Sequence, residues 1–360
     1  MSAPIESRKQ KTTGKSDMVS GNNKMPGNFY LRFNFTILKN KTLVFGTAAL
    51  FILAATICHS EDESWKFVRI SDTQADTSQW KTSTDHRLVN VQICGEIARA
   101  IVREKADLVI VAGDVVTQGC DDGYKLWREV MSPVYQAGIP IFPVRGNHDA
   151  CNTKSWENAF EADIPANGPA NETGFTYFVT NKNAIFIGFD VYINTNKRHR
   201  VNQEWLDKVV AKNTLPHVFV YAHEPAFKLI HKDCLGTYPE ERNKFWETLK
   251  KAGARVYFCG HDHVFDHARI DDGDGNPDND IHQYVGSAGG GPLYHGGKYD
   301  GTNAPYTPKR IFHEEKYGYI VCEIKGPDVK VVWKRRVNTN VFEEAESWSY
   351  TAPAKTGLIK

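Results

Sequence analysis

Residues 143–149, Pro-Val-Arg-Gly-Asn-His-Asp, close an apolar run with three side chains suited to chemistry. Asn147 offers a neutral amide oxygen to a cation. His148 can exchange a proton near neutral pH, and Asp149 carries a carboxylate that can orient an imidazole. Gly-Asn-His-Asp is also ordinary turn chemistry. This stretch alone therefore leaves a polar turn and a functional site equally open.

Four other apolar runs end in side chains of the same kinds. They are residues 67–71 before Asp72, 108–112 before Gly113 and Asp114, 218–222 before His223, and 256–259 before Gly260, His261, Asp262 and His263. Apolar runs of this length, bounded by turn residues, read as buried strands. Five strands would then place carboxylate, amide and imidazole groups at one edge of the fold. This repetition favours a functional site over a simple polar turn.

The elements that must position these residues alternate strand, helix, strand, helix, strand after Trp65, which is typical of an α/β layered fold. Helical spacing of apolar residues predicts helices at 85–105 and 124–134, and helices are also expected at 202–213 and 239–251. Residues 175–179 and 184–189 predict a hairpin. Strands alone follow, at 264–270, 282–285, 317–324 and 329–337. No repeat or linker interrupts 65–337, so we expect one domain.

Composition and charge narrow the function classes. The 360 residues are 41% hydrophobic, enough to bury a full core. Residues 1–41 hold eight of the 44 basic residues and two of the 43 acidic ones. The rest of the chain is therefore mildly acidic, which argues against a nucleic-acid-binding surface.

Residues 42–58 form an uncharged apolar segment between Lys41 and Glu61. Its 17 residues are at the short limit for a membrane span. Cys58 and Ser60 would suit cleavage after residue 60. A cleaved signal peptide, an uncleaved anchor and a buried core helix are all open. With either export signal the N-terminus stays cytosolic. We then expect the rest of the chain to lie outside the cytoplasm. It would be secreted or periplasmic, or anchored to the membrane by residues 42–58 alone.

Two cysteines predict a disulfide. Cys120 and Cys151 each follow a site-bearing strand by a few residues, so both should lie in loops on the same face, within disulfide reach. An exported protein meets an oxidising compartment. Cys259 and Cys322 lie inside apolar runs and are expected to be buried free thiols.

Residues 271–280 alternate oxygen-bearing side chains as a calcium loop does. The glutamate at the twelfth position of an EF-hand and the flanking helices are missing, so we favour a solvated hairpin loop. Gly286 and the glycines at 289–291 lack the strand-to-helix context of a phosphate-cradling loop. We expect them to lie close to the site.

The succession of blocks at 72–74, 113–114, 146–149, 223 and 260–263 resembles the calcineurin-like metallophosphoesterase superfamily, over about residues 65–337. Five blocks in the family's order make this resemblance specific. It implies a sandwich of two β-sheets flanked by helices, with a dinuclear metal site at the C-terminal ends of the strands. One metal would be held by Asp72, Gln74, Asp114 and His263, and the other by Asp114, Asn147, His223 and His261.

The resemblance implies a metal-dependent hydrolase of phosphoric esters, either phosphomonoesters or phosphodiesters. Two cations about 3.5 Å apart bind the phosphoryl oxygens and lower the pKa of a bridging water, so a bridging hydroxide would attack the phosphorus. The ions would be divalent manganese, zinc, iron or magnesium. His148 would assist the leaving group, and Asp149 would orient His148. The expected domain spans 61–340, between a tail with its export signal at 1–60 and a C-terminal tail at 341–360.

Two residues depart from the family's pattern. Gln74 stands where the family usually has His, and its amide oxygen is a harder, weaker donor that favours manganese or magnesium over zinc. Thr117 stands where purple acid phosphatases have Tyr, so a tyrosinate-bound ferric ion is not expected and the likeness to them is one of architecture. Gln74 also motivates an alternative, a catalytically degenerate member that binds a phosphorylated ligand or partner.

Overall fold

The computed structural model describes residues 64–75, 88–193, 198–286 and 288–353. The predicted tail and apolar segment at 1–60 lie outside these ranges. Within them, no helix has the length and apolarity needed to cross a membrane.

The described strands form two sheets. The six-stranded sheet has the order β13 (Val341–Thr351), β12 (Asp328–Asn338), β11 (Gly318–Lys325), β1 (Trp65–Ile70), β2 (Leu108–Ala112) and β3 (Ile141–Val144). Strands β1, β2 and β3 are parallel, whereas β11, β12 and β13 pair antiparallel. The first three strands therefore end at one edge.

The seven-stranded sheet has the order β10 (Thr307–Glu314), β8 (Phe265–Asp271), β9 (Ile281–Val285), β7 (Val256–Cys259), β6 (His217–Ala222), β5 (Ala184–Phe189) and β4 (Tyr177–Asn181). Its neighbours β5, β6, β7 and β9 are parallel. The predicted hairpin of β4 and β5 is confirmed as an antiparallel pair.

Aromatic side chains fill the space between the two sheets. The ring of Phe67 on β1 lies 4.9 Å from that of Phe186, 4.7 Å from that of Phe219 and 6.1 Å from that of Phe258, all on the seven-stranded sheet. All four side chains are buried. Edge-to-face aromatic contacts of this kind favour a fixed packing of one sheet on the other.

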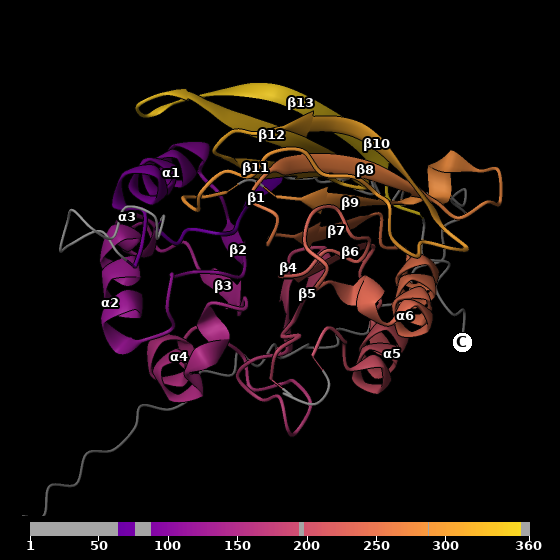
Figure 1. Cartoon of the computed structure of the whole chain (residues 1–360), viewed down its shortest axis with the longest axis horizontal. Coiled ribbons are helices and arrows are strands. Elements are labelled where there is room, and N and C mark those ends of the chain that lie inside the picture. The colour runs from indigo at the N-terminus through magenta and orange to yellow at the C-terminus, as the bar shows by residue number, and fades with distance from the viewer. Residues whose placement is uncertain (1–63, 76–87, 194–197, 287, 354–360) are drawn as a thin grey trace, which may run out of the picture. The chain divides into compact units, whose positions relative to one another are not determined.

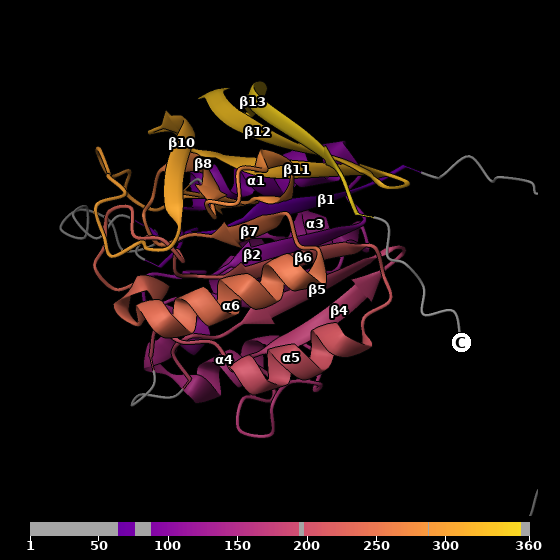
Figure 2. The ribbon, with the colours of Figure 1, turned by 90° about the vertical axis from the view of Figure 1, so that its right-hand side faces the viewer.

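Helices cover the outer faces of the sandwich. The six-stranded side carries α1 (Val91–Glu104), α2 (Asp121–Val130), α3 (Ser132–Gln136) and α4 (Thr153–Phe160), and the seven-stranded side carries α5 (Gln203–Lys212) and α6 (Pro239–Ala252). Figures 1 and 2 show the two groups on opposite sides of the strands. The predicted sandwich of two sheets flanked by helices is therefore confirmed.

Two predicted helices have different limits in the structure. Helix α1 begins at Val91 because the side chain of Asn90 accepts a hydrogen bond from Ile93 N at 3.1 Å and caps the helix. The helix predicted through residues 124–134 is broken at Met131. Pro133 has no N–H to donate to the preceding turn, so α2 ends and α3 begins there.

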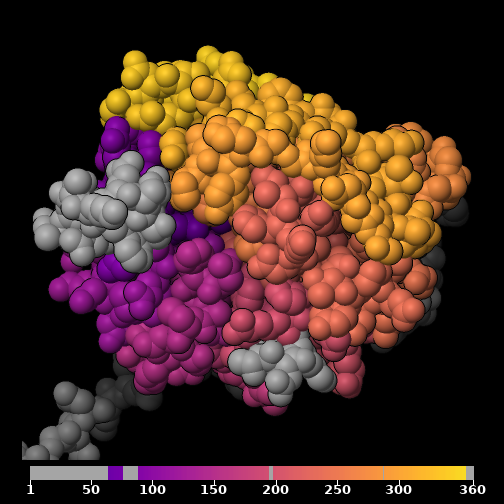
Figure 3. Space-filling model, in the orientation of Figure 1, coloured from indigo at the N-terminus to yellow at the C-terminus, as the bar shows by residue number. Residues whose placement is uncertain are grey.

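The expected C-terminal tail is largely a strand, which corrects the domain boundary at 340. Strand β13 pairs with β12 from Thr351 opposite Asp328 to Val341 opposite Asn338. Most of its exposed side chains are polar, and ion pairs such as Arg335 with Glu343 connect β13 to β12. An edge strand with one polar face reads as a tail in sequence. Figure 3 shows these yellow strands along one side of the domain. The edge strand β10 was missed for the same reason.

The loop at 271–280 joins β8 to β9, an antiparallel pair, as the hairpin prediction expected. It contains the short 3-10 helix η4 (Pro277–Asn279). The ammonium group of Lys250 contacts the carboxylates of Asp272 and Asp274. These two acidic side chains thus have a cationic partner within the protein.

Candidate metal centre

The seven predicted ligands lie just beyond the carboxyl ends of parallel strands in both sheets. Asp72 and Gln74 follow β1, Asp114 follows β2, Asn147 follows β3, His223 follows β6, and His261 and His263 follow β7. A hydrogen bond from Gly289 N to Ser71 O, 2.8 Å, joins the two sheet edges here. Open α/β sheets bind ligands at such an edge.

Asp72, Gln74 and His263 form the first group of side chains. His263 Nε2 lies 3.4 Å from Asp72 Oδ1 and 3.1 Å from Gln74 Nε2. Asp72 Oδ2 and Gln74 Oε1 are buried and have no hydrogen-bond partner among the described residues. Buried oxygens of this kind are costly unless something binds them. The donor set therefore fits a divalent cation.

Asn147, His223 and His261 form the second group. His223 Nε2 lies 3.1 Å from Asn147 Oδ1 and 3.2 Å from His261 Nδ1. Asp114 joins the two groups, because its Oδ2 lies 3.0 Å from Gln74 Nε2 and 3.4 Å from His223 Nε2. Ligand atoms of Asp72, Asp114 and His223 all lie within 4.8 Å of one another.

The backbone is strained at four of these positions. Asp72, Asp114, His261 and His263 have φ values of 53°, 50°, 74° and 38°, where non-glycine residues are uncommon. His261 N donates to Asp72 Oδ1 at 3.0 Å, which holds two of them together. A Cβ on Gly146 would lie 2.0 Å from Asp114 Oδ1, so only glycine fits there. Strain of this kind concentrates at functional sites.

The carboxylates and imidazoles of the centre change each other's pKa. Burial raises the pKa of Asp114, but the nearby His223 and His148 outweigh it and hold that pKa below its ordinary value. Burial likewise opposes a charge on His223, yet Asp114 and Asp72 raise its pKa to about 10. A cation that binds here must therefore displace a proton.

His148 lies beside the predicted ligand Asp114, whereas Asp149 does not orient His148 as the sequence predicted. His148 Nδ1 donates to Thr117 O at 2.7 Å, and Nε2 lies 4.0 Å from Asp114 Oδ2. Asp149 begins the 3-10 helix η2 (Asp149–Cys151), and its Oδ2 accepts from the backbone N–H of Gly146 and Val115. The carbonyl of Thr117 rather than Asp149 orients His148. Burial and the neighbouring Asp114 raise the pKa of Asp149 to about 7.

Residues 66–265 match the family described as calcineurin-like phosphoesterase, which is more than half of the chain. The chain belongs to the calcineurin-like phosphoesterase family. The order of the ligand blocks and the two-sheet sandwich agree with this membership.

One curated relative of this metallophosphoesterase is a probable glycerophosphodiester phosphodiesterase from Arcobacter nitrofigilis, 25% identical over 140 residues. The match covers 36% of this chain and 45% of the relative, so the chain spans less than half of that protein. The phosphodiesterase activity in that name is therefore stated for the relative and not for this chain.

Solved structures share the fold at low identity. A purple acid phosphatase from yellow lupin has a TM-score of 0.62 and 13% identity, over 83% of this chain and 58% of that one. GAP50, described as the anchor in the inner membrane complex of Plasmodium, has a TM-score of 0.55 and 16% identity, over 81% and 90%. At these identities the likeness establishes the fold only.

Three residues at the metallophosphoesterase centre were missed in the sequence. Asp233 Oδ2 lies 3.3 Å from His261 Nε2, and the ring of His231 lies 4.4 Å from that of His261. Tyr294 stacks on His263 with ring centroids 4.5 Å apart. The available signal was the polar stretch 231–233 in the loop after the strand that delivers His223. The glycines at 289–291 do lie close to the site, since Gly291 N donates to Asp72 O at 2.8 Å.

The predicted disulfide is not formed. Cys120 is partly buried, Cys151 is exposed, and both are free thiols. Their loops are neighbours, because Cys151 Sγ lies 3.4 Å from Gly119 O. That thiol points at the carbonyl oxygens of Gly119 and His148 instead of at the other cysteine. Cys259 and Cys322 are buried free thiols, as predicted.

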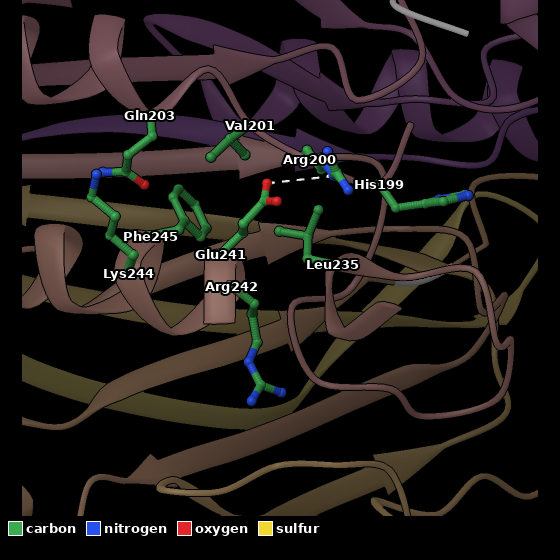
Figure 4. Close-up of a pocket in the computed structure, with 9 residues that line it drawn as sticks. All are labelled: His199, Arg200, Val201, Gln203, Leu235, Glu241, Arg242, Lys244 and Phe245. Carbon is green, nitrogen blue, oxygen red and sulfur yellow. Dashed lines mark ion pairs between the residues drawn. The ribbon is translucent and has the colours of Figure 1, made fainter. Parts of the chain in front are cut away.

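A cavity of about 220 Å³ lies between the segment before α5 and the start of α6. Figure 4 shows its lining, with Glu241 pointing toward Arg200 across a 3.4 Å ion pair. Leu235 and Phe245 contribute apolar surface. His199, at one end, is bound to Glu224 at 2.7 Å. None of the seven predicted ligands lines this cavity.

Proposed function

We propose that this chain hydrolyses phosphoric esters with two divalent cations held by the two groups of side chains, Asp114 contacting both. The observation that carries the proposal is the position of Asp114 Oδ2, 3.0 Å from Gln74 Nε2 in the first group and 3.4 Å from His223 Nε2 in the second. A carboxylate can bridge two cations and offset part of their charge. Apart from Asp72 in the first group, the remaining ligands are amides and imidazoles, which complete the two ligand shells without adding negative charge.

Bound cations would supply Lewis acidity, neutralising phosphoryl oxygens and lowering the pKa of the water that attacks the phosphorus. His148 would donate a proton to the leaving oxygen. Because its Nδ1–H is donated to Thr117 O, the transferable proton of the cationic ring is the one on Nε2. That nitrogen faces Asp114, and the side chain is 38% exposed, so a substrate can reach it.

Both phosphomonoesters and phosphodiesters suit this chemistry, and the name of the curated relative makes a glycerophosphodiester the first natural substrate to assay. The oxygen donors Gln74 and Asn147 favour manganese or magnesium over zinc. The body of the protein would act outside the cytoplasm, in keeping with the apolar segment at 42–58.

The test is to purify the chain, count bound metal ions, and assay mono- and bis-nitrophenyl phosphate and a glycerophosphodiester with manganese, zinc and magnesium. Activity that requires metal and disappears with a chelator is the expected result. Asp300→Ala, on the exposed surface, serves as a control that should behave as wild type. A metal-free protein inert toward every ester would favour the alternative, a member that binds a phosphorylated ligand without hydrolysing it.

A further inference from the structure

Two of the three ligand imidazoles have the same arrangement. His223 Nε2 faces the other ligands, while its Nδ1 donates to Ala112 O at 2.9 Å. His263 Nε2 faces Asp72 and Gln74, while its Nδ1 donates to Pro292 O at 2.8 Å. In both rings a neutral backbone carbonyl accepts the proton of the outer nitrogen, so the inner nitrogen is the one that binds a cation once it has given up any proton it carries.

His261 is reversed. Its Nδ1 lies 3.2 Å from His223 Nε2 and faces the other ligands, whereas its outer nitrogen is Nε2. That nitrogen is buried and lies 3.3 Å from Asp233 Oδ2. The outer partner of this ring is therefore a carboxylate rather than a backbone carbonyl.

We propose that Asp233 is a positioning residue for the second cation, accepting the Nε2–H of His261 so that Nδ1 binds the metal. This inference rests on the proposed function. A carboxylate on the outer nitrogen fixes the tautomer and ring orientation and raises the basicity of the ligating nitrogen. The 3.3 Å contact is not fully aligned as a hydrogen bond, but rotation of a side chain that is 45% exposed can supply the alignment.

The loop around Asp233 is anchored on both sides, so the carboxylate stays within reach of His261. Before it, Asp262 accepts hydrogen bonds from the backbone N–H of Ile230 and His231, each at 3.0 Å. After it, Leu235 N donates to Pro225 O at 3.0 Å. Asp262 lies between the ligands His261 and His263, so the anchor and the metal centre share one backbone segment.

The experiment measures metal affinity without substrate. Cobalt(II) is titrated into the metal-free full chain against a competing chelator, for wild type, Asp233→Asn, Asp233→Ala and the control Glu204→Ala, whose side chain pairs with Lys208 on the surface of α5. For Asp233→Ala we expect the cation held by the second group of ligands to bind about 10- to 100-fold more weakly. The affinity of the first group for its cation should not change. Asp233→Asn, which keeps an acceptor oxygen without the charge, should fall between.

A spectroscopic signal separates positioning from a general loss of structure. In the cobalt-loaded wild type, proton NMR should show a paramagnetically shifted, exchangeable signal from His261 Nε2–H. That signal should shift in Asp233→Asn and exchange faster with water in Asp233→Ala. If the alanine variant fails to fold, the cobalt affinity and the Nε2–H signal are measured on the nearly isosteric asparagine variant instead.

Wild-type affinity and an unchanged Nε2–H signal in both Asp233 variants would overturn the inference alone. A wild-type chain that binds no cobalt would overturn the proposed metal centre, and this inference with it.

Discussion

At the scale of single residues, His148 has a role that depends on the substrate. An alkyl alkoxide leaving group needs a proton, whereas nitrophenolate, with a pKa near 7, hardly does. General acid catalysis supplies about 10²- to 10⁴-fold. His148→Ala should therefore slow hydrolysis of an alkyl ester by that factor and that of a nitrophenyl ester far less, with metal content unchanged.

Rates on matched alkyl and nitrophenyl esters, with metal analysis of each preparation, check this prediction. Equal losses on both esters would argue instead that His148 stabilises charge on the phosphoryl oxygens. Loss of metal would show that His148 is itself a ligand.

His223 makes metal binding depend on pH. With its pKa raised to about 10 by Asp114 and Asp72, the metal-free imidazole is protonated at neutral pH, and a cation must displace that proton. Apparent affinity should therefore fall about tenfold for each pH unit below 10, and binding should release protons. Chelator competition at pH 6, 7 and 8 measures the slope. An affinity independent of pH over this range would contradict the assignment.

Residue types after each strand could be read from sequence, because buried strands are continuous apolar runs and a polar residue marks their end. The directions of side chains could not. Asp149 looks like a partner for the adjacent His148, but the 3-10 turn aims its carboxylate back at Gly146 N and Val115 N. Asp233 lies 28 positions before its partner His261, and only the path of the folded loop brings them together.

At the scale of elements, a buried histidine pair attaches the C-terminal strand. His267 on β8 lies 2.7 Å from His282 on β9 and 3.0 Å from Glu346 on β13, and Trp348 stacks on His282. Burial, the neighbouring His267 and nearby arginines lower the pKa of His282 to about 2. Below its ordinary pKa of about 6.5, only the unfolded chain takes up this proton. The free energy of unfolding should therefore fall as the pH drops.

His282 should lower the free energy of unfolding by up to about 1.4 kcal/mol for each unit by which the pH falls between 6.5 and 2. Denaturant unfolding of wild type and His282→Gln at pH 7, 5.5 and 4.5 measures it, since glutamine cannot take up the proton. The variant should lose less stability on acidification than wild type does. Parallel losses in the two proteins would show that His282 does not carry this acid sensitivity.

Strands at the edges of the two sheets are harder to predict from sequence patterns than central strands are. The central strands β2, β6 and β7 are buried on both faces and read as apolar runs, and β1 does so apart from Lys66 and the buried Arg69. Strands β10 and β13 lie at the sheet edges and carry charged side chains, so their stability comes from pairing with β8 and β12. Pairing partners distant in sequence are not visible in local periodicity.

At the scale of the whole molecule, the expected export of the domain is still a prediction. The apolar segment at 42–58 lies outside the described residues, and its basic flank predicts a cytosolic N-terminus. Fractionation of cells that express the tagged full chain, with N-terminal sequencing, checks this. Cleavage would give a chain beginning at Glu61, whereas an anchor would leave the intact chain in the membrane. An intact chain in the cytoplasm would contradict both forms of export.

The Asp114 carboxylate is proposed to serve two cations, and the number of metal ions bound per chain of Asp114→Asn measures whether it does. Loss of the shared negative charge should lower occupancy at both positions and abolish hydrolysis, because Asp114 contacts both groups of ligands. Gln74→His, changed in the first group only, should retain or raise metal affinity. We predict two ions per chain in wild type and a loss from both positions in Asp114→Asn, whereas an Asp114→Asn chain that still binds two ions would contradict the shared carboxylate.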